Sequence, residues 1–163
     1  MRWYRHRLTQ KIKTVMSIRK IREDDVLQLS ELFVSVFNEP PWSQDWKKEW
    51  AYERLSIIFK SYRFYGCLAE VDDRPVAAIL SRLSSFKGEL ELEIMENFVV
   101  REEQRKGVGA SLLNELKSSA RADGIRCFVL QTGRDTFAKN FYMKYGFRAH
   151  EDNLMMSHEF ESP

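Results

Sequence analysis

The amino-acid sequence predicts an α/β fold in which helices cover the faces of a mixed sheet. Segments in which apolar and polar residues alternate predict strands, and segments with apolar residues at helical spacing predict helices between them. Turn residues separate the two kinds of segment. Taken in order, the predicted elements are β-α-α-β-β-β-α-β-α-β. With 163 residues, of which 44% are hydrophobic and 31% charged, the chain is long enough for one domain with its own core.

The first part of the chain is expected to form one strand and two helices, over residues 17–21, 25–38 and 43–60. Asp25 and Gln28 are spaced as in a capping box, which would start the first helix. Pro40 and Pro41 would end it, because proline has no backbone N–H. Ser43 can cap the second helix.

The rest of the chain is expected to form three consecutive strands and then two units of helix followed by strand. These elements span strands 64–71, 76–83 and 89–100, a helix from the glycine loop described below to about 123–124, strand 127–131, helix 136–145, and a terminal strand or hairpin over 147–150 and 154–160. The strand ELELEIMENFVV alternates at its start and is continuously apolar at its end, so we expect it to be half exposed first and buried later.

The formal net charge of +2 conceals an uneven distribution. The first fifteen residues carry five basic side chains and no acid, and without those five the chain has 21 basic against 24 acidic residues, a net of −3. This mildly acidic body gives no support for nucleic-acid binding and suits a cationic small substrate. Met16 would serve as a start directly ahead of a strand, so we expect residues 1–15 to be a flexible extension or a mis-called upstream start, with organelle targeting as the alternative. Residues 16–163 are expected to form a single domain.

The cysteines, histidines and hydropathy argue against several classes of protein. Cys67 and Cys127 lack CxxC spacing, lie in apolar runs and are expected to be buried free thiols. The three histidines are scattered, so we expect no metal site. No apolar run reaches the length needed to cross a bilayer, and the N-terminus lacks the apolar core of a secretory signal. We therefore expect a cytoplasmic protein that binds no membrane.

The stretch QRKGVG, residues 104–109, precedes an amphipathic run and is typical of a loop that holds a phosphate. A nucleotide P-loop would need GxxxxGK[ST], which is absent, and a dinucleotide fingerprint would need glycine where Leu112 stands. Backbone N–H groups at the start of the following helix, with Arg105 and Lys106 beside them, favour an anion. An ordinary tight turn is the alternative.

Two segments together resemble a known family. FVVREEQRKGVGASLLNEL is similar to the acetyl-CoA motif of the GNAT N-acetyltransferases, and AKNFYMKYGF resembles the helix of that family that ends in Phe-Tyr, three residues and Gly-Phe. The resemblance covers residues 17–160 in element order, and its sequence-specific part covers 93–147. It implies an N-acetyltransferase with acetyl-CoA as co-substrate, and a V-shaped split between the fourth and fifth strands that takes the pantetheine arm. The family's strand also carries a bulge, which fits the alternation lost after Ile94.

The resemblance also implies which residues hold acetyl-CoA. The pantetheine amides would pair with the strand backbone as an added strand does, and the pyrophosphate would lie on the amides of the glycine loop. Many family members carry asparagine where this chain has Asp135, and Asn140 nearby could supply an amide contact instead. The cofactor-binding residues implied are Phe98, Val99, Val100, Gln104, Arg105, Lys106, Gly107, Val108, Gly109, Ala110 and Asn140.

Transfer of an acetyl group from a thioester to an amine needs a base for the amine, a donor for the oxyanion and an acid for the departing thiolate. Glu96 is the first candidate for the base and Glu93 the second, because both lie where the family places one. The ordinary alternative for each is a solvated strand charge. A backbone N–H near Val99 or Val100 would hold the oxyanion.

Tyr142 matches the general acid of the family, a phenol near the cofactor sulfur. The alternative is a role in core packing. The buried stripe of its helix is expected at a spacing of four residues, at Phe137, Phe141 and Tyr145. Tyr142 would then stand just beside that stripe, which favours a functional role.

The sequence leaves the acceptor open. Aromatic side chains in and after the second helix could wall a site for an amine-bearing ligand, namely Trp42, Trp46, Trp50, Tyr52, Tyr62 and Phe64. Trp46 and Trp50 are four residues apart and share a face with Arg54, so we expect both to pack the helix onto the sheet. A negative field could come from Glu39, Asp45 and Glu49. A small amine, an aminoglycoside-like amine and a protein amine all stay open, as does a homodimer, and a non-catalytic acyl-CoA-binding module is the alternative function.

Overall fold

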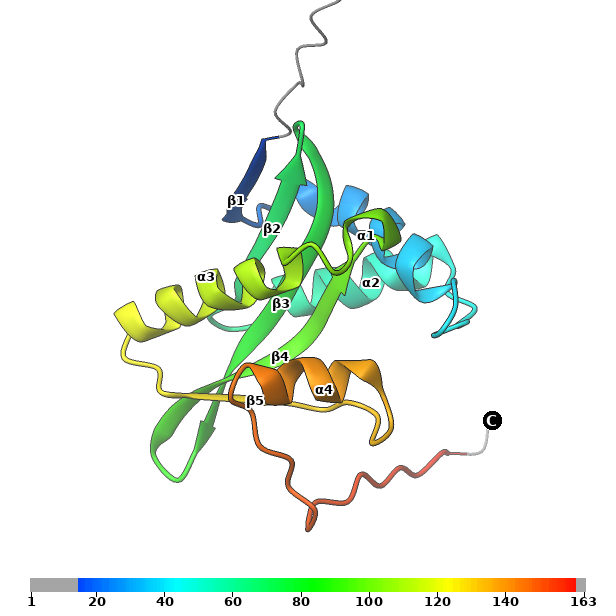
Figure 1. Ribbon diagram of the computed structural model, residues 1–163. Coiled ribbons are helices and arrows are strands. Elements are labelled where there is room, and N and C mark those ends of the chain that lie inside the picture. The colour runs from blue at the N-terminus through cyan, green and yellow to red at the C-terminus, as the bar shows by residue number, and fades with distance from the viewer. Residues whose placement is uncertain (1–14, 161–163) are drawn as a thin grey trace, which may run out of the picture. The chain divides into compact units, whose positions relative to one another are not determined.

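The computed structural model describes residues 15–160 (Figure 1). The chain divides into two compact units, one that ends at Leu130 and one that begins at Gln131. The two units are described separately. The extension expected over residues 1–15 lies outside the described residues apart from Val15, which is exposed.

The first unit is built on a sheet of five strands in the order β1-β2-β3-β4-β5. The strands are β1 (Met16–Lys20), β2 (Tyr65–Val71), β3 (Arg74–Phe86), β4 (Glu89–Val99) and β5 (Cys127–Leu130). The first four strands pair antiparallel, and β5 runs parallel to β4. The predicted mixed sheet is therefore confirmed. β3 is longer than expected because both its turns are short: Asp72 and Asp73 have positive φ angles of 50° and 60°, and only Lys87 and Gly88 separate it from β4.

A bulge interrupts the pairing of β3 with β4. Leu80 pairs with Glu96, but the next residue, Ser81, pairs with Ile94, so Met95 has no partner on β3. An extra residue of this kind turns two successive side chains toward one face of the sheet. Met95 packs against the core formed with α1 and α2, and Glu96 contacts Arg54 on α2. The bulge predicted after Ile94 is confirmed.

β4 and β5 pair over only part of their length. Their register runs from Glu91 opposite Cys127 to Ile94 opposite Leu130, where β5 ends, while β4 continues to Val99. The predicted split between the fourth and fifth strands begins at this point. Beyond Ile94, β4 has its strand partner on the β3 side alone among the residues described.

Helices cover both faces of this sheet (Figure 1). α1 (Asp25–Phe37) and α2 (Lys48–Phe59) pack on one face, where Leu29, Phe33 and Leu55 are fully or almost fully buried against Leu68 and Leu80. α3 (Val108–Ala122) packs on the other face. Its inner stripe is the predicted one, made by Val108, Leu112, Leu113 and Leu116.

The two cysteines differ in their surroundings. Cys67 is buried beneath α3, where its Sγ lies 3.6 Å from the carbonyl oxygen of Leu112, and burial raises its pKa to about 12. Cys127 is exposed at the start of the short strand β5. The expectation of a buried thiol is confirmed for Cys67 and wrong for Cys127, because an apolar neighbourhood in sequence does not cover the first residue of a strand.

The start of α2 differs from the prediction. The helix begins at Lys48, and Ser43 has a φ of 45°, which is not the extended geometry of an N-cap. The side chain of Asn38 holds the intervening segment, because its Nδ2 donates to Trp46 O at 2.9 Å and its Oδ1 accepts from Trp46 N at 2.8 Å. Trp46, expected to pack the second helix onto the sheet, lies before α2 and packs edge-on against Phe33 of α1. Trp50 does not pack on the sheet and is 49% exposed.

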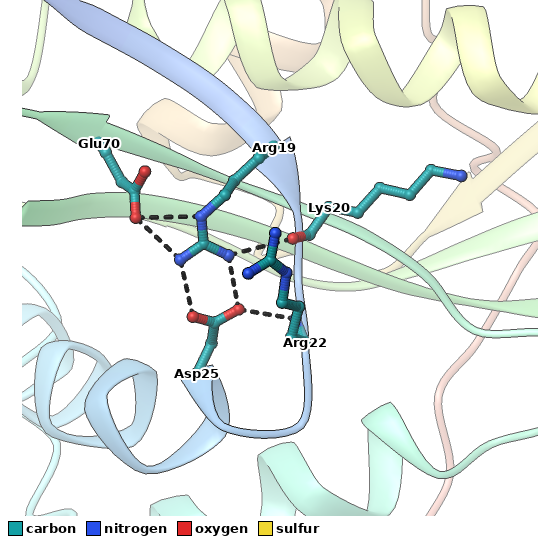
Figure 2. Close-up of polar contacts among 5 residues, drawn as sticks. All are labelled: Arg19, Lys20, Arg22, Asp25 and Glu70. Carbon is teal, nitrogen blue, oxygen red and sulfur yellow. Dashed lines mark hydrogen bonds and ion pairs between the residues drawn. The ribbon is translucent and has the colours of Figure 1, made fainter. Parts of the chain in front are cut away.

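An arginine at the start of the chain ties three elements together (Figure 2). Arg19 on β1 donates through Nη1 and Nη2 to Asp25 at the start of α1, at 2.7 and 2.8 Å, and through Nε and Nη2 to Glu70 on β2, at 3.1 and 2.8 Å. Asp25 also accepts the backbone N–H of Arg22 at 2.7 Å. These hydrogen bonds hold the pKa of Asp25 below its usual range, chiefly through Arg19.

The second unit contains α4 (Phe137–Lys144), whose first turn is capped when Thr136 Oγ1 accepts from Lys139 N at 3.3 Å. The terminal strand or hairpin expected over 147–150 and 154–160 is wrong, because those residues form no strand. A strand needs a partner, and the described part of this unit holds no other strand. Leu154, Met155, Met156 and Phe160 are exposed instead.

Candidate functional site

The first unit holds a buried carboxylate on β4. Glu96 is 8% exposed, and its Oε1 accepts from Nε of Arg54 on α2 at 2.5 Å and lies 2.5 Å from Nη2 of the same arginine. Burial raises the pKa of Glu96, while the charge and hydrogen bond of Arg54 act in the opposite direction. The pKa of this carboxyl group is thereby raised above that of an ordinary glutamate, and the group stays anchored to a cation.

Glu93 lies on the same strand in a more open position. It is the direct cross-strand partner of Arg82 on β3, whose Nε donates to Glu93 Oε2 at 2.7 Å. The side chain of Glu93 is 25% exposed, against 8% for Glu96. Glu96 is therefore the more desolvated of the two candidate bases.

A cavity of about 310 Å³ lies between α2, β3 and β4, and both arginines line it. Apolar side chains make most of the remaining wall, among them Trp46, Trp50, Ile57 and Met95. Ser61 also lines the cavity, and its Oγ is buried without a hydrogen-bond partner among the residues described. A concave, largely apolar cavity with a few polar groups is the usual form of a small-molecule site.

The glycine loop connects β4 to α3. A short 3-10 helix over Arg101–Glu103 leads into it, and Arg105 and Gly107 adopt left-handed conformations with φ angles of 61° and 88°. Gly107 is the N-cap of α3 and supplies no side-chain cap, so the first N–H groups of the helix have no acceptor within it. These groups and the helix dipole can receive an anion. Lys106 forms an ion pair with Glu103 at 3.1 Å, which reduces the contribution of its charge.

The backbone of β4 presents alternate residues to its open edge. Val100 N donates to Val76 O at 2.9 Å, on the β3 side, so the main-chain groups of Val99 point to the opposite edge. Gln104 confirms this direction, because its Nε2 donates to Val99 O at 2.9 Å. Of the three strand residues predicted to bind the cofactor backbone, Val99 is therefore the one directed to the side where β5 has ended.

Tyr142 and Asn140 lie on α4 in the second unit. Tyr142 is buried, with its ring centroid 5.1 Å from those of Phe141 and Phe147, whereas Phe137 is 53% exposed. The buried side of α4 thus includes Tyr142, and the stripe predicted from the four-residue spacing is wrong. Gly146, with a φ of 90°, turns the chain after the helix and lets Phe147 fold back onto Tyr142.

The arginines at the cavity were missed as site residues. Arg54 was recognised only as part of a helix face, and Arg82 was not singled out. The sequence carries no local signal for the pair of Arg54 with Glu96, because 42 positions separate them. Alternation did offer a signal for Arg82 and Glu93, since opposite charges facing each other across a hairpin are a common stabilising pair.

Metal ligands and membrane-spanning helices bear on the class of site. Among residues 15–160, no group of three or more His, Cys, Asp or Glu side chains is arranged to hold a metal ion. Within the same residues, no helix has the length and hydropathy to span a bilayer.

Known structures share this architecture. The aminoglycoside acetyltransferase meta-AAC0020 from an uncultured soil metagenomic sample, in complex with trehalose, is 21% identical with a TM-score of 0.70, and the match covers 90% of this chain and 97% of that one. A possible acetyltransferase from Clostridium difficile 630 is 18% identical with a TM-score of 0.76, over 90% and 99% of the two chains. AAC(6')-Iy in complex with a bisubstrate analogue is 14% identical with a TM-score of 0.70, over 90% and 99%. At these identities the likeness shows the fold.

Sequence comparison assigns the family. No curated protein matches the chain. The family model described as "Acetyltransferase (GNAT) domain" matches residues 15–158, which include the sheet, the glycine loop and α4. Since this match spans most of the sequence, the chain belongs to the GNAT acetyltransferase family.

Proposed function

We propose that this protein transfers an acetyl group from acetyl-CoA to a primary amine by direct attack in a ternary complex. The observation that carries the proposal is the buried carboxylate of Glu96, anchored by Arg54 beside a cavity that can hold a small amine. Membership of the family supports the reaction class. The glycine loop and the open edge of β4 support acetyl-CoA as the donor.

Glu96 is the proposed general base. An aliphatic amine has a pKa near ~10 and arrives as an ammonium ion, so it must lose a proton before its nitrogen can attack. The raised pKa of the Glu96 carboxyl makes it a better proton acceptor than an ordinary carboxylate. Glu93 is the second candidate.

The remaining steps follow from the chemistry of the thioester. The neutral nitrogen forms a bond to the carbonyl carbon and then loses its extra proton to solvent, and the carbon–sulfur bond breaks to give a neutral amide and a thiolate. A backbone N–H near Val99 would stabilise the oxyanion formed between these steps. Tyr142 would donate a proton to the thiolate, since a phenol with a pKa of ~10 can protonate a thiol group of similar pKa.

The donor would be held by main-chain groups. Val99 would pair with a pantetheine amide at the open edge of β4, as an added strand does. The pyrophosphate would lie on the N–H groups of residues 105–110, where the left-handed Gly107 brings the backbone close. Phe98, Val100 and Gln104 would support this edge. Asn140, from the second motif, would supply an amide contact to the cofactor.

The acceptor is proposed to be a small molecule. Structures similar to this chain include aminoglycoside acetyltransferases, and the cavity beside Glu96 is of a size for small ligands. No observation favours the alternative of an acyl-CoA-binding module without turnover. The cytoplasmic location expected from the sequence stays a prediction.

A thiol-release assay tests the proposal. Purified protein, acetyl-CoA and a panel of primary amines are expected to give amine-dependent release of free CoA thiol, with a matching amount of acetylated amine found by mass spectrometry. Tight binding of acetyl-CoA without release from any amine or peptide would contradict the enzyme and favour the binding module.

A further inference from the structure

The cavity between α2, β3 and β4 is lined by an arginine that binds the proposed base. Arg54 lines the cavity and binds Glu96, and Arg82 lines it and binds Glu93. An amine that enters this space meets the two arginines that bind the proposed bases, Glu96 and Glu93. The following inference rests on the proposed acetyl transfer and concerns the acceptor of that reaction.

The walls of the cavity are better suited to an apolar body than to a sugar. Trp46, Trp50, Ile57 and Met95 line it, and the indole of Trp50 is half exposed. Lys47 Nζ lies 4.5 Å from the centre of the Trp50 ring, which holds that ring in place from one side. When an apolar ligand covers exposed aromatic and aliphatic surface of this kind, the burial contributes favourably to the free energy of binding.

The charges in the cavity disfavour a polycation. A ligand with several ammonium groups is best held by several carboxylates that are not already paired. Glu96 and Glu93 are each neutralised by an arginine, and those two guanidinium groups, half-exposed at the wall, face an incoming ligand. Glu53 is the one carboxylate in the lining. Like charges placed together in an interface oppose binding, so each further ammonium group lowers affinity.

The volume sets a limit on size. At about 310 Å³ the cavity lies at the low end of the usual range for ligand pockets. We propose that the acceptor is a compact primary monoamine with an aryl or branched alkyl body, and that Arg54 and Arg82 exclude polyamines and aminoglycosides. The proposed acceptors are therefore smaller and carry fewer charges than the aminoglycosides that give several of the similar structures their names.

Steady-state kinetics with three amines tests the acceptor class. 2-Phenylethylamine, spermidine and kanamycin are compared at saturating acetyl-CoA by thiol release. The kcat/KM for 2-phenylethylamine is expected to exceed those for the two polycations by about tenfold or more, in line with the cost of misplaced polar groups in an apolar pocket. Equal or faster release with spermidine or kanamycin would overturn the acceptor class and leave the acetyltransferase standing. No release with any of the three would overturn the acceptor class, and the wider panel of amines and peptides would then decide on the acetyltransferase itself.

Variants identify the residues responsible. Trp50→Ala should raise the KM for 2-phenylethylamine by roughly tenfold with a small change in kcat, because it removes apolar wall and not a reacting group. Tyr52→Ala is the matched control, since Tyr52 lies on the same helix, is 46% exposed and does not line the cavity. Arg82→Gln should raise kcat/KM for spermidine relative to 2-phenylethylamine by freeing Glu93. Equal KM values in the Trp50 and Tyr52 variants, or an unchanged spermidine ratio in Arg82→Gln, would overturn the assignment of these residues.

Discussion

Arg54 meets Glu96 at a single oxygen: Nε and Nη2 of the guanidinium both lie 2.5 Å from Oε1. Neither contact uses Oε2, the oxygen that a base would present to an amine. The arginine therefore anchors the carboxylate in a buried position and opposes the rise in its pKa that burial causes. Removal of either partner should be visible in the pH dependence of the reaction.

Arg54→Gln should shift the acidic limb of the pH profile to higher pH. Arg54 lowers the pKa of Glu96, so its loss leaves burial unopposed and the carboxyl stays protonated up to a higher pH. A base works only when deprotonated, and kcat/KM should fall at a pH where the parent enzyme is active. Arg54→Lys keeps the charge and should shift the limb less. If the acidic limb of both variants lay at the same pH as in the parent enzyme, the role of the pair would be contradicted.

Glu96→Gln should lower kcat by on the order of tenfold or more, since general-base catalysis contributes at least that much. Glu93→Gln is the matched comparison, because it removes the same charge from the same strand and should have the smaller effect. Both are measured at saturating amine and acetyl-CoA across pH. A larger loss in Glu93→Gln would identify Glu93 as the general base. Full activity in both variants would mean that neither glutamate of β4 is the base.

Gly107→Ala should weaken acetyl-CoA binding by roughly tenfold, because a side chain costs about 1–2 kcal/mol in a left-handed conformation and the loop would change shape to avoid it. Gly88→Ala is matched for strain, since Gly88 has a φ of 85° against 88° for Gly107 and an added Cβ meets nothing within 4 Å at either site. Calorimetry should show a normal dissociation constant for the Gly88 variant. Weakened binding in both would mean that the effect is general destabilisation.

Tyr142→Phe should lower kcat and leave the dissociation constant for acetyl-CoA near that of the parent protein. The substitution keeps the ring that packs against Phe141 and Phe147 and removes only the hydroxyl. Tyr145→Phe removes a hydroxyl from the end of the same helix and serves as control. If Tyr142→Phe lowers the melting temperature and keeps full turnover, its role is in packing.

Asp25→Asn should reduce stability at neutral pH by about 1.5–3 kcal/mol, the range for hydrogen bonds to charged groups. The pKa of Asp25 is lowered in the folded state from its usual 3.8, so its contribution is present above that value and is lost as the pH falls through the lower folded pKa. The free energy of unfolding of the parent protein, measured with urea, should therefore fall below about pH 4, and that of the variant should fall less. Glu31→Gln, which breaks an exposed pair with Lys48, should change stability less than Asp25→Asn does, because solvent screens exposed ion pairs.

The sequence predicted those parts of the fold that depend on neighbours along the chain. Alternation and helical spacing located the strands and helices, and the glycine loop was recognised from six residues. The predictions failed where distant groups decide. The start of α2 depends on Asn38 bonding to Trp46, and the buried side of α4 depends on Phe147 folding back onto Tyr142. The partner of Glu96 could not be found because no pattern links position 54 to position 96.

The bulge at Met95 decides which side chains of β4 share a face. Glu93 and Glu96 are three positions apart, an odd spacing that in a regular strand puts side chains on opposite faces. Because Met95 takes no partner, Glu93, Ile94 and Glu96 follow one another in the ladder, and the two glutamates lie on the same face. Deletion of Met95 would leave a regular ladder with these same pairs, so both acids would keep their shared face. When relatives of this protein are aligned, a gap at this position is therefore compatible with the site, whereas a strand of the same length that paired every residue would put the two acids on opposite faces.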